Sequence, residues 1–277
     1  MFDTEFKNNC TILKNISYFD LAQTLDCGQA FRWYENEDGS WSGIVKDKCI
    51  TVSKKNNGII IENCTKSDFN ELWCDYFDLN RDYSEVYTSV SKDGTLKKAA
   101  DYGSGIRILN QQPFETLCSF IISQNNNIPR IKGIIERLCE NFGSKCGDRY
   151  TFPDANTLSK LSVEDLAPLR SGFRAKYIID AAQKVASGEI NLDILKTADT
   201  DCARETLMKI KGVGPKVADC TLLFGLSHIE AFPKDVWIKR AMSVLFDGEL
   251  PECAKQYAGI AQQYIFYYAR SGNLNIS

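Results

Sequence analysis

The spacing of apolar residues changes near residue 98, and this change constrains the fold more than any other feature of the sequence. From about residue 17 to 65, aromatic and β-branched residues alternate with polar ones, and the pairs Asp38-Gly39 and Asn57-Gly58 interrupt the alternation. Such pairs between alternating runs are the strongest short-range signal of a β-hairpin. This part of the chain therefore predicts an antiparallel β-sheet.

Beyond about residue 98 the apolar residues recur with a helical period. Between Ile131 and Phe142 they fall at i, i+3, i+4, i+7 and i+11, and Gly143 follows as a helix stop. Similar stripes occupy residues 174–189 and 255–272. The pattern predicts an α+β chain, in which an antiparallel sheet domain at 1–98 packs on an all-α body at 99–277.

Composition restricts the compartment and the class of partner. The eleven cysteines are an odd number without a CxxC pair, which predicts neither a disulfide framework nor a zinc site. We expect a soluble intracellular protein without a metal, because the sequence shows no basic-then-apolar leader and no membrane-spanning run. The formal net charge of −3 argues against a general binder of polyanions.

The stretch LMKIKGVGPKVADC, residues 207–220, reads as a helix, a Gly-rich turn and a second helix, within a helical hairpin at about 201–226. Pro215 suits the first position of the second helix. The backbone N–H groups of a helix N-terminus bind anions, so Gly212, Val213 and Gly214 are candidates for holding a phosphate group. A plain tight turn between helices explains the same letters.

Lys216 lies in the first turn of that second helix, where the helix dipole disfavours the charged form of an amine. A neutral lysine is a nucleophile that forms Schiff bases. The alternative is an ordinary surface lysine. Asp235 lies in a loop at 231–236 and precedes an apolar periodic run, so it reads as a helix N-cap, and its carboxylate also suits charge stabilisation or proton transfer.

The hairpin followed by AFPKDVWIKR resembles the signature of the helix-hairpin-helix glycosylases. Four further segments narrow the resemblance to the 8-oxoguanine DNA glycosylases of the eukaryotic type: DCGQAFRW (26–33), CSFIISQNNNIPRIKGIIERLC (118–139), SGFRAKYI (171–178) and YAGIAQQYIF (257–266). Only Cys253 follows Cys220, so the four closely spaced cysteines of the iron-sulfur branches are missing.

This resemblance implies a bifunctional glycosylase and AP lyase that flips the damaged base out of duplex DNA and needs no cofactor. Lys216 matches the nucleophile that displaces the base, forms a Schiff base and permits β-elimination 3′ to the abasic site. Asp235 matches the aspartate that supports this step.

Four residues match the family's pocket for the damaged base. The carbonyl of Gly28 matches the acceptor for the N7–H that 8-oxoguanine has and guanine lacks. Gln262 matches the residue on the Watson–Crick edge, and Phe266, one helical turn later, matches the ring stacked on the base. Cys220 matches the residue on the other face of the base, although a small core residue is an equally good interpretation.

Asn125, Arg130 and Arg174 match the family's residues that contact the orphaned cytosine opposite the lesion. Alternatively, both arginines are ordinary surface residues, and Asn126 or Asn127 caps a helix. Two departures stand out: Phe173 replaces a wedging tyrosine and Trp237 replaces a histidine of the animal enzymes. The lone histidine, His228, is interpreted as structural.

The expected partner is double-stranded DNA that contains 8-oxoguanine, preferably opposite cytosine. We expect the protein to bind it as a monomer and not to associate with a membrane. In a prokaryote we expect the protein in the cytoplasm, at the nucleoid. In a eukaryote we expect it in the nucleus. One alternative is an alkylated-base DNA glycosylase, which uses the aspartate without a lysine, and Lys216 argues against it. The other is a non-catalytic helix-hairpin-helix DNA-binding protein, which has no need of Lys216, Asp235 and the pocket residues together.

Overall fold

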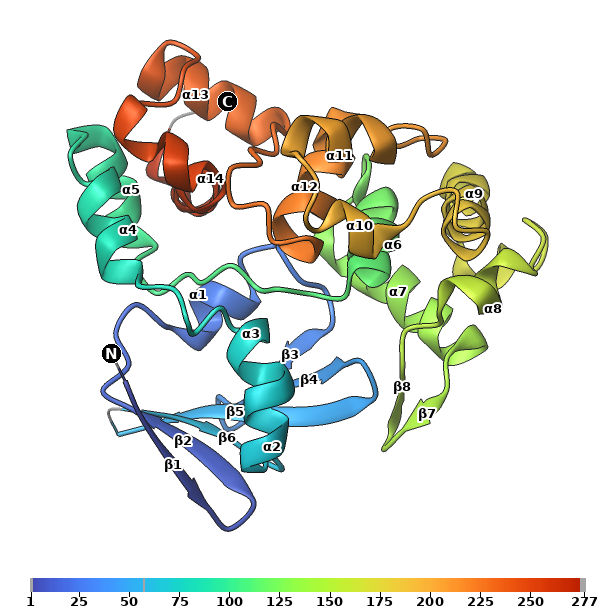
Figure 1. The fold of residues 1–277 in the computed structure, drawn as a ribbon, viewed down its shortest axis with the longest axis horizontal. Coiled ribbons are helices and arrows are strands. Elements are labelled where there is room, and N and C mark those ends of the chain that lie inside the picture. Colours follow the sequence, from blue (N-terminus) through green and yellow to red (C-terminus); the bar gives the residue numbers. More distant parts are fainter. Residues whose placement is uncertain (1, 57, 275–277) are drawn as a thin grey trace.

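The computed structural model describes residues 2–56 and 58–274, in which a six-stranded antiparallel sheet precedes a helical body (Figure 1). The strand order is β1-β2-β6-β5-β4-β3. The strands are β1 (Asp3–Lys7), β2 (Cys10–Lys14), β3 (Trp33–Glu35), β4 (Trp41–Val45), β5 (Lys48–Lys55) and β6 (Gly58–Ile61). The predicted antiparallel sheet is confirmed, but it begins at Asp3 rather than near residue 17.

The Asp38-Gly39 pair forms the predicted turn between β3 and β4, and Gly39 has a positive φ of 78°. Asn57 of the second predicted turn lies outside the described residues, while Lys55 and Gly58 on either side of it pair across β5 and β6. Both predicted hairpins therefore have their strands paired.

The β1–β2 hairpin was missed by the sequence prediction. Its turn residues Asn8 and Asn9 have φ values of 52° and 57°. Two consecutive positive φ values are typical of the type I′ turn, which asparagine tolerates well. The Asn-Asn pair itself was the available signal.

A short helix covers one face of the sheet (Figure 1). It consists of α2 (Lys66–Asp68), a π-helical turn (Phe69–Trp73) and α3 (Cys74–Tyr76). Its aromatic residues pack on the sheet, and the buried Trp33 of β3 donates a hydrogen bond from Nε1 to the Tyr76 hydroxyl at 2.8 Å. Together with α1 (Leu21–Leu25), this helix closes the smaller of two apolar cores.

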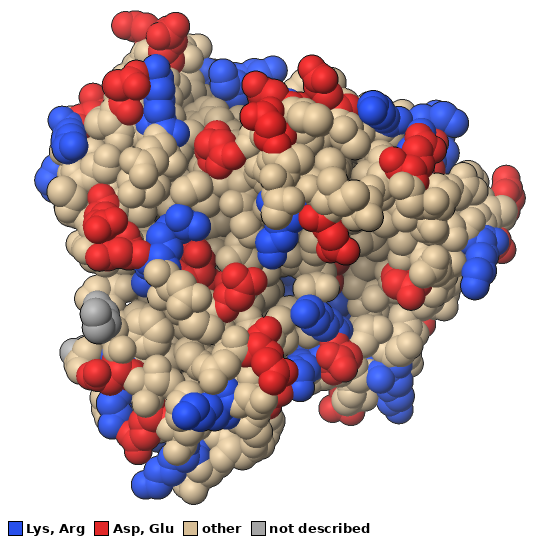
Figure 2. Space-filling view, in the orientation of Figure 1, with Lys and Arg blue, Asp and Glu red and all other residues tan. Residues whose placement is uncertain are grey.

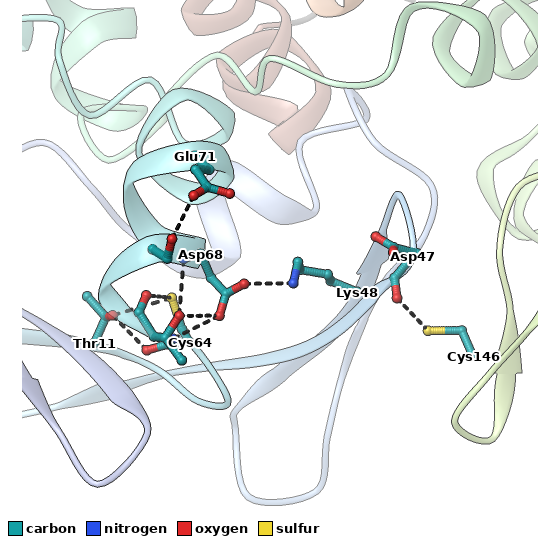
Figure 3. Close-up of polar contacts among 9 residues, drawn as sticks. Thr11, Asp47, Lys48, Cys64, Asp68, Glu71 and Cys146 are labelled. Carbon is teal, nitrogen blue, oxygen red and sulfur yellow. Dashed lines mark hydrogen bonds and ion pairs between the residues drawn. The ribbon is translucent and has the colours of Figure 1, made fainter.

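A capping box begins α2 and ties it to the sheet. Asp68 accepts hydrogen bonds from the backbone and side chain of Thr65, and Lys48 of β5 donates to its carboxylate at 2.6 Å (Figure 3). The hydrogen bond from Lys48, followed by those from Thr65, lowers the pKa of Asp68 to about 2.

The rest of the described chain is mainly helical, which confirms the predicted fold class. Its helices are α4 (Tyr83–Val90), α5 (Gly94–Tyr102), α6 (Pro113–Ser123), α7 (Ile128–Phe142), α8 (Ala155–Ser159), α9 (Ala175–Ala186), α10 (Leu192–Leu195), α11 (Thr200–Leu207), α12 (Pro215–Gly225), α13 (Val236–Phe246) and α14 (Ala258–Tyr268). A two-stranded hairpin, β7 (Lys145–Cys146) and β8 (Arg149–Tyr150), follows α7. None of the helices in residues 2–56 and 58–274 has the length and apolar character to cross a bilayer.

The larger core draws helices from distant parts of the sequence. Buried side chains of α4 and α5 join those of α6, α12 and α14 in one cluster, and α14 lies against α5 (Figure 1). Residue 98, where the periodicity changes, therefore lies inside a helix of the body. The predicted division at this residue follows the sequence pattern, while the larger core extends across it.

Two cysteines meet between the sheet and the helical body. Cys49 of β5 and Cys146 of β7 have their Sγ atoms 2.7 Å apart, although all eleven cysteines are free thiols. The Cys146 side chain points toward the turn that holds Asp47, whose carbonyl lies 3.3 Å from its Sγ (Figure 3). No other pair of cysteine sulfurs approaches so closely within the described residues.

Candidate active site

The α11–α12 hairpin forms as the sequence predicted. Pro215 occupies the first turn of α12, and Gly214 is the N-cap residue. Gly212 has a φ of +78°, and a Cβ at this position would lie 2.4 Å from the ring of Tyr177. Both the backbone angle and the contact therefore require glycine in this turn.

The amides of this turn differ in their availability. Val213 donates its N–H to the carbonyl of Ile210 at 3.1 Å, so this amide is already used within the turn, contrary to the prediction. No described residue accepts a hydrogen bond from the amides of Gly212 or Gly214. The free donors of the hairpin are consequently those of the two glycines and of the first turn of α12.

The Lys216 side chain is half-buried, and its amine contacts residues of α6. Its Nζ donates a hydrogen bond to Ser123 Oγ at 3.1 Å and lies 5.0 Å from the centre of the Phe120 ring. Ser123 in turn donates to the Phe120 carbonyl at 2.8 Å. Neither residue was predicted, because on α6 they read only as part of a largely buried helix.

Asp235 caps α13, as predicted. Its Oδ1 accepts a hydrogen bond from the Ile238 N–H at 2.7 Å. Because a cap residue is held at the helix entrance by its own side chain, the carboxylate has a fixed position at the start of α13.

A small cavity, called the lysine cavity here, brings most of the predicted residues together. Six of its lining residues were predicted, namely Gly28, Lys216, Cys220, Asp235, Gln262 and Phe266. Four were not, namely Phe120, Phe224, Pro233 and Gln263. Its volume of about 50 Å³ is below the range of roughly 300–1,000 Å³ typical of ligand pockets, so a base could enter only if side chains moved.

Cys220 lies on the α12 wall of this cavity and is buried. Burial raises the pKa of its thiol to about 11, while the neighbouring Lys216 acts in the opposite direction. Cys220 is thus a core residue of α12 that also forms part of the cavity wall, and its contact with a base stays a prediction.

The α14 wall carries two consecutive buried glutamines. Gln263 donates a hydrogen bond from Nε2 to Gln262 Oε1 at 3.1 Å, and Gln262 donates from Nε2 to the Pro233 carbonyl at 3.2 Å. The sequence predicted one apolar face for this helix, but every residue from Ala258 to Ile265 is buried. The reason is that α14 packs against α5 and α13 on different sides.

Gly28 enters the cavity from the segment before β3. Its φ is +89°, and a Cβ there would contact Phe266 at 3.5 Å and Arg270 at 3.7 Å. A side chain would meet only ordinary van der Waals contacts, so the backbone conformation is what favours glycine.

Away from the cavity, Arg174 is only 2 % exposed, which makes its interpretation as a surface arginine wrong. Its guanidinium donates to the carbonyls of Gln124, Asn125 and Ser171. Burial, followed by the charge of the nearby Arg130, lowers its pKa. Arg174 therefore holds the loop before α7 in shape.

The loop that Arg174 holds presents other predicted residues to solvent. Asn125 is exposed and has a φ of +47°, and Arg130 is exposed on the first turn of α7. Asn127 caps this helix by accepting a hydrogen bond from the Arg130 N–H at 3.0 Å. Phe173 is 51 % exposed, with the Arg174 guanidinium 4.4 Å from its ring centre.

The remaining predicted positions lie at helix ends. Trp237, on the first turn of α13, is 44 % exposed. His228 is buried, and its ring nitrogens lie 2.8 Å from the Leu195 carbonyl and the Thr200 hydroxyl. The histidine thus joins α10 to α11, in agreement with a structural role. The described residues contain no cluster of three metal-ligating side chains.

An open groove of about 590 Å³ adjoins the lysine cavity at Lys216. Gly214 and Pro215 of the hairpin line it together with Lys234 and Lys239. The carboxylates of Asp219 and Glu230 also line it, and Asp219 forms an ion pair with Arg204 at 2.6 Å. Helix N-terminal amides and lysine ammonium groups along one groove favour an anionic chain.

Two family models together match residues 11–252 of the chain. The 8-oxoguanine DNA glycosylase N-terminal domain matches residues 11–117, and the HhH-GPD superfamily of base excision DNA repair proteins matches residues 118–252.

Individual proteins show the same similarity. An N-glycosylase/DNA lyase of Saccharomyces cerevisiae is 34 % identical over 82 % of this chain and 68 % of its own length. A probable N-glycosylase/DNA lyase of Methanothermobacter thermautotrophicus is 35 % identical over 72 % of this chain and 74 % of its own. The Clostridium acetobutylicum 8-oxoguanine glycosylase/lyase, solved with double-stranded DNA containing cytosine opposite 8-oxoguanine, is 40 % identical with a TM-score of 0.93 and 99 % of both chains covered.

Proposed function

The chain belongs to the 8-oxoguanine DNA glycosylase family of the HhH-GPD superfamily, and from this membership we propose that Lys216 is the nucleophile with which it removes 8-oxoguanine from duplex DNA and then cuts the strand. The protein is a bifunctional N-glycosylase/DNA lyase. The single observation that carries the assignment of Lys216 is its place between the lysine cavity and the groove.

The position of Lys216 suits an attack on a deoxyribose carbon. Its Nζ is held by Ser123 at 3.1 Å, while the residue lines both the cavity and the groove that adjoins it. A nucleotide extruded from a strand in the groove would put its base in the cavity and its sugar at the boundary. Among the cavity-lining residues, Lys216 is the one with an amine.

The chemistry requires the nitrogen lone pair of the Lys216 amine. Nζ forms a bond to C1′, and the glycosidic bond breaks with its electron pair leaving on the base, which takes up a proton. The amine then loses a proton and the C1′–O4′ bond breaks, with O4′ taking up a proton, which opens the sugar ring and gives the Schiff base. Loss of a C2′ proton and departure of the 3′ phosphate follow, and water then releases Lys216. The carboxylate of Asp235 stabilises the positive charge that develops on the sugar.

The walls of the cavity suit a purine lesion. Phe266 and Cys220 provide two faces between which a flat base stacks, and Gln262 presents an amide to its edge. The Gly28 carbonyl would accept the N7–H of 8-oxoguanine and be left without a partner by guanine.

The exposed loop before α7 suits recognition of the opposite base, and we propose a preference for cytosine. Asn125 and Arg130 offer donors at the surface, while the buried Arg174 fixes the loop that carries Asn125. Phe173 extends from the same region as an apolar wedge for the gap in the base stack.

The DNA backbone fits the groove rather than a broad basic face. Figure 2 shows lysine and arginine interspersed with aspartate and glutamate over the visible face, consistent with a formal net charge of −3. The amide of Gly214, with Lys234 and Lys239, would bind phosphates in the groove, and the amide of Gly212 is a further free donor in the same turn. We propose that one copy of the chain does so as a monomer.

Borohydride trapping tests the assignment of Lys216. With duplex DNA that carries 8-oxoguanine opposite each of the four bases, the wild type should give a covalent adduct, release free 8-oxoguanine and react fastest opposite cytosine. Lys216→Gln should abolish the adduct and reduce base release by at least about 10³-fold, because the nucleophile is absent.

Lys160→Gln is the matched control, since Lys160 is exposed at the end of α8 and away from the lysine cavity. This variant should react like the wild type. An adduct that survives in Lys216→Gln would show that another amine is the nucleophile and would disprove the assignment.

A further inference from the structure

Gln263 has a buried amide oxygen without a hydrogen-bond partner in the wall of the lysine cavity. The residue is 3 % exposed, it lines the cavity beside Gln262, and its Oε1 is not hydrogen-bonded to any described residue. A buried acceptor without a partner is costly, and most such atoms in folded proteins are satisfied. A ligand that brings an N–H donor into the cavity would remove this cost.

The hydrogen bonds fix which end of the Gln263 amide is free. The Pro233 carbonyl can only accept, so Gln262 must face it with Nε2. Gln262 then presents Oε1 to Gln263, so Gln263 must donate the hydrogen bond from its own Nε2, at 3.1 Å. The atom left over on Gln263 is therefore the oxygen, because the Pro233 carbonyl fixes the orientation of both amides.

Gln262 alone is insufficient to satisfy the donors of a guanine-type base. Its Nε2 is bonded to Pro233, and one of the two lone pairs of its Oε1 is used by Gln263. The Watson–Crick edge of 8-oxoguanine carries three N–H hydrogens, one on N1 and two on the 2-amino group. One remaining lone pair on Gln262 cannot accept them all, so a second acceptor is needed.

We propose that Gln263 Oε1 accepts a hydrogen bond from the 2-amino group of the extruded base and is a specificity residue for 2-aminopurine lesions. This inference rests on the proposed function, because it assumes that the lysine cavity receives the base. It adds a discrimination that Gly28 does not provide, since the N7–H is read at the opposite edge of the ring. Oxidised purines without a 2-amino group should be poor substrates.

Two forms of the enzyme, each measured with two substrates, test the contact between Gln263 and the 2-amino group. Wild type and Gln263→Met are compared in single-turnover base release from duplexes with 8-oxoguanine or 8-oxohypoxanthine, which lacks only the 2-amino group. Loss of the 2-amino group should slow the wild type about 10-fold, and Gln263→Met should slow release of 8-oxoguanine by a similar factor. The variant should show no further loss with 8-oxohypoxanthine, because the contact is already absent.

A control variant makes the result decisive. The exposed Gln183→Met should match the wild type with both substrates. If the effects of Gln263→Met and of the missing 2-amino group multiply, Gln263 only supports Gln262 and the proposal is wrong. A wild type that releases no 8-oxoguanine would instead overturn the proposed function.

Discussion

The Ser123 hydroxyl orients the Lys216 amine through a hydrogen bond. Its hydroxyl proton is donated to the Phe120 carbonyl, so the oxygen meets the lysine as an acceptor, at 3.1 Å. Loss of one neutral hydrogen bond changes a free energy by about 1 kcal/mol. We therefore expect Ser123→Ala to slow single-turnover release of 8-oxoguanine about 5-fold and to leave DNA affinity unchanged.

Ser159→Ala is the control for this prediction. Ser159 makes the same type of bond to a carbonyl three residues earlier, in α8, and this bond is exposed. Its variant should keep the wild-type rate. Equal rates for Ser123→Ala and the wild type would show that the lysine is held by its surroundings without the hydroxyl.

At the scale of residues, the sequence predicted side chains whose roles depend on local signals. Pro215 and Asp235 take the helix-start positions that their neighbours indicated. Ser123 and Gln263 escaped prediction because their partners come from distant segments, and periodicity reports only that they are buried. The interpretation of Arg174 as a surface residue failed for the same reason, since the Gln124 and Asn125 carbonyls that it binds belong to a loop about 50 residues away in the chain.

Elements with clear start and stop signals were predicted best. Helix α7 ends at the predicted Gly143, and α12 begins at Pro215. The short helix at 66–76 was missed because it contains a π-helical turn and too few residues to display a period. The extent of burial of α14 also escaped prediction, because it depends on the helices packed around it.

The capping box of α2 gives an element-scale prediction about pH. The pKa of Asp68 is about 2 in the fold and 3.8 ordinarily, so the carboxylate stabilises the protein above about pH 4. This contribution is lost as the pH falls from about 4 to 2. Since Lys48 is 45 % exposed and solvent screens the pair, we expect Asp68→Asn to cost about 1 kcal/mol at pH 6.

Urea unfolding of both proteins between pH 6 and pH 2 measures this difference. It should shrink toward zero at the acid end. Asp148→Asn, at an exposed carboxylate without a hydrogen bond in the described part of the chain, should show no such trend. A difference that stays constant with pH would exclude the carboxylate charge as its source.

For the whole molecule, the sequence predicted the order of sheet and helices but not how the two apolar cores divide the chain. The larger core includes Tyr83 and Leu96, which precede the change in periodicity, together with Tyr264 of α14. A pattern along the chain reveals the elements, whereas the assignment of an element to a core depends on its neighbours in space.

The contact between Cys49 and Cys146 predicts a redox-dependent stability of the whole molecule. Oxidation by glutathione disulfide would join their sulfurs and transfer the two thiol hydrogens to glutathione. Because the bond would close a loop of about 100 residues, we expect the Tm to rise by about 5–10 °C. Peptide mapping identifies the linked cysteines, and thermal unfolding measures the shift.

Two serine variants separate this effect from other oxidation. Cys49→Ser should abolish the rise in Tm, whereas Cys202→Ser, at an exposed thiol of α11, should retain it. Oxidised wild type with a linked Cys49–Cys146 peptide but an unchanged Tm would contradict the prediction.

The packing of α14 against α5 also determines when the enzyme can become active during its synthesis. The ribosome makes α4 and α5 early and α14 much later, and non-local contacts of this kind slow folding. Lys216 emerges before Gln262 and Phe266, so a nascent chain has its nucleophile before it has the wall that selects a base. Completion of the larger core and assembly of the lysine cavity therefore coincide, and the chain acquires its selection of substrate only when α14 has packed.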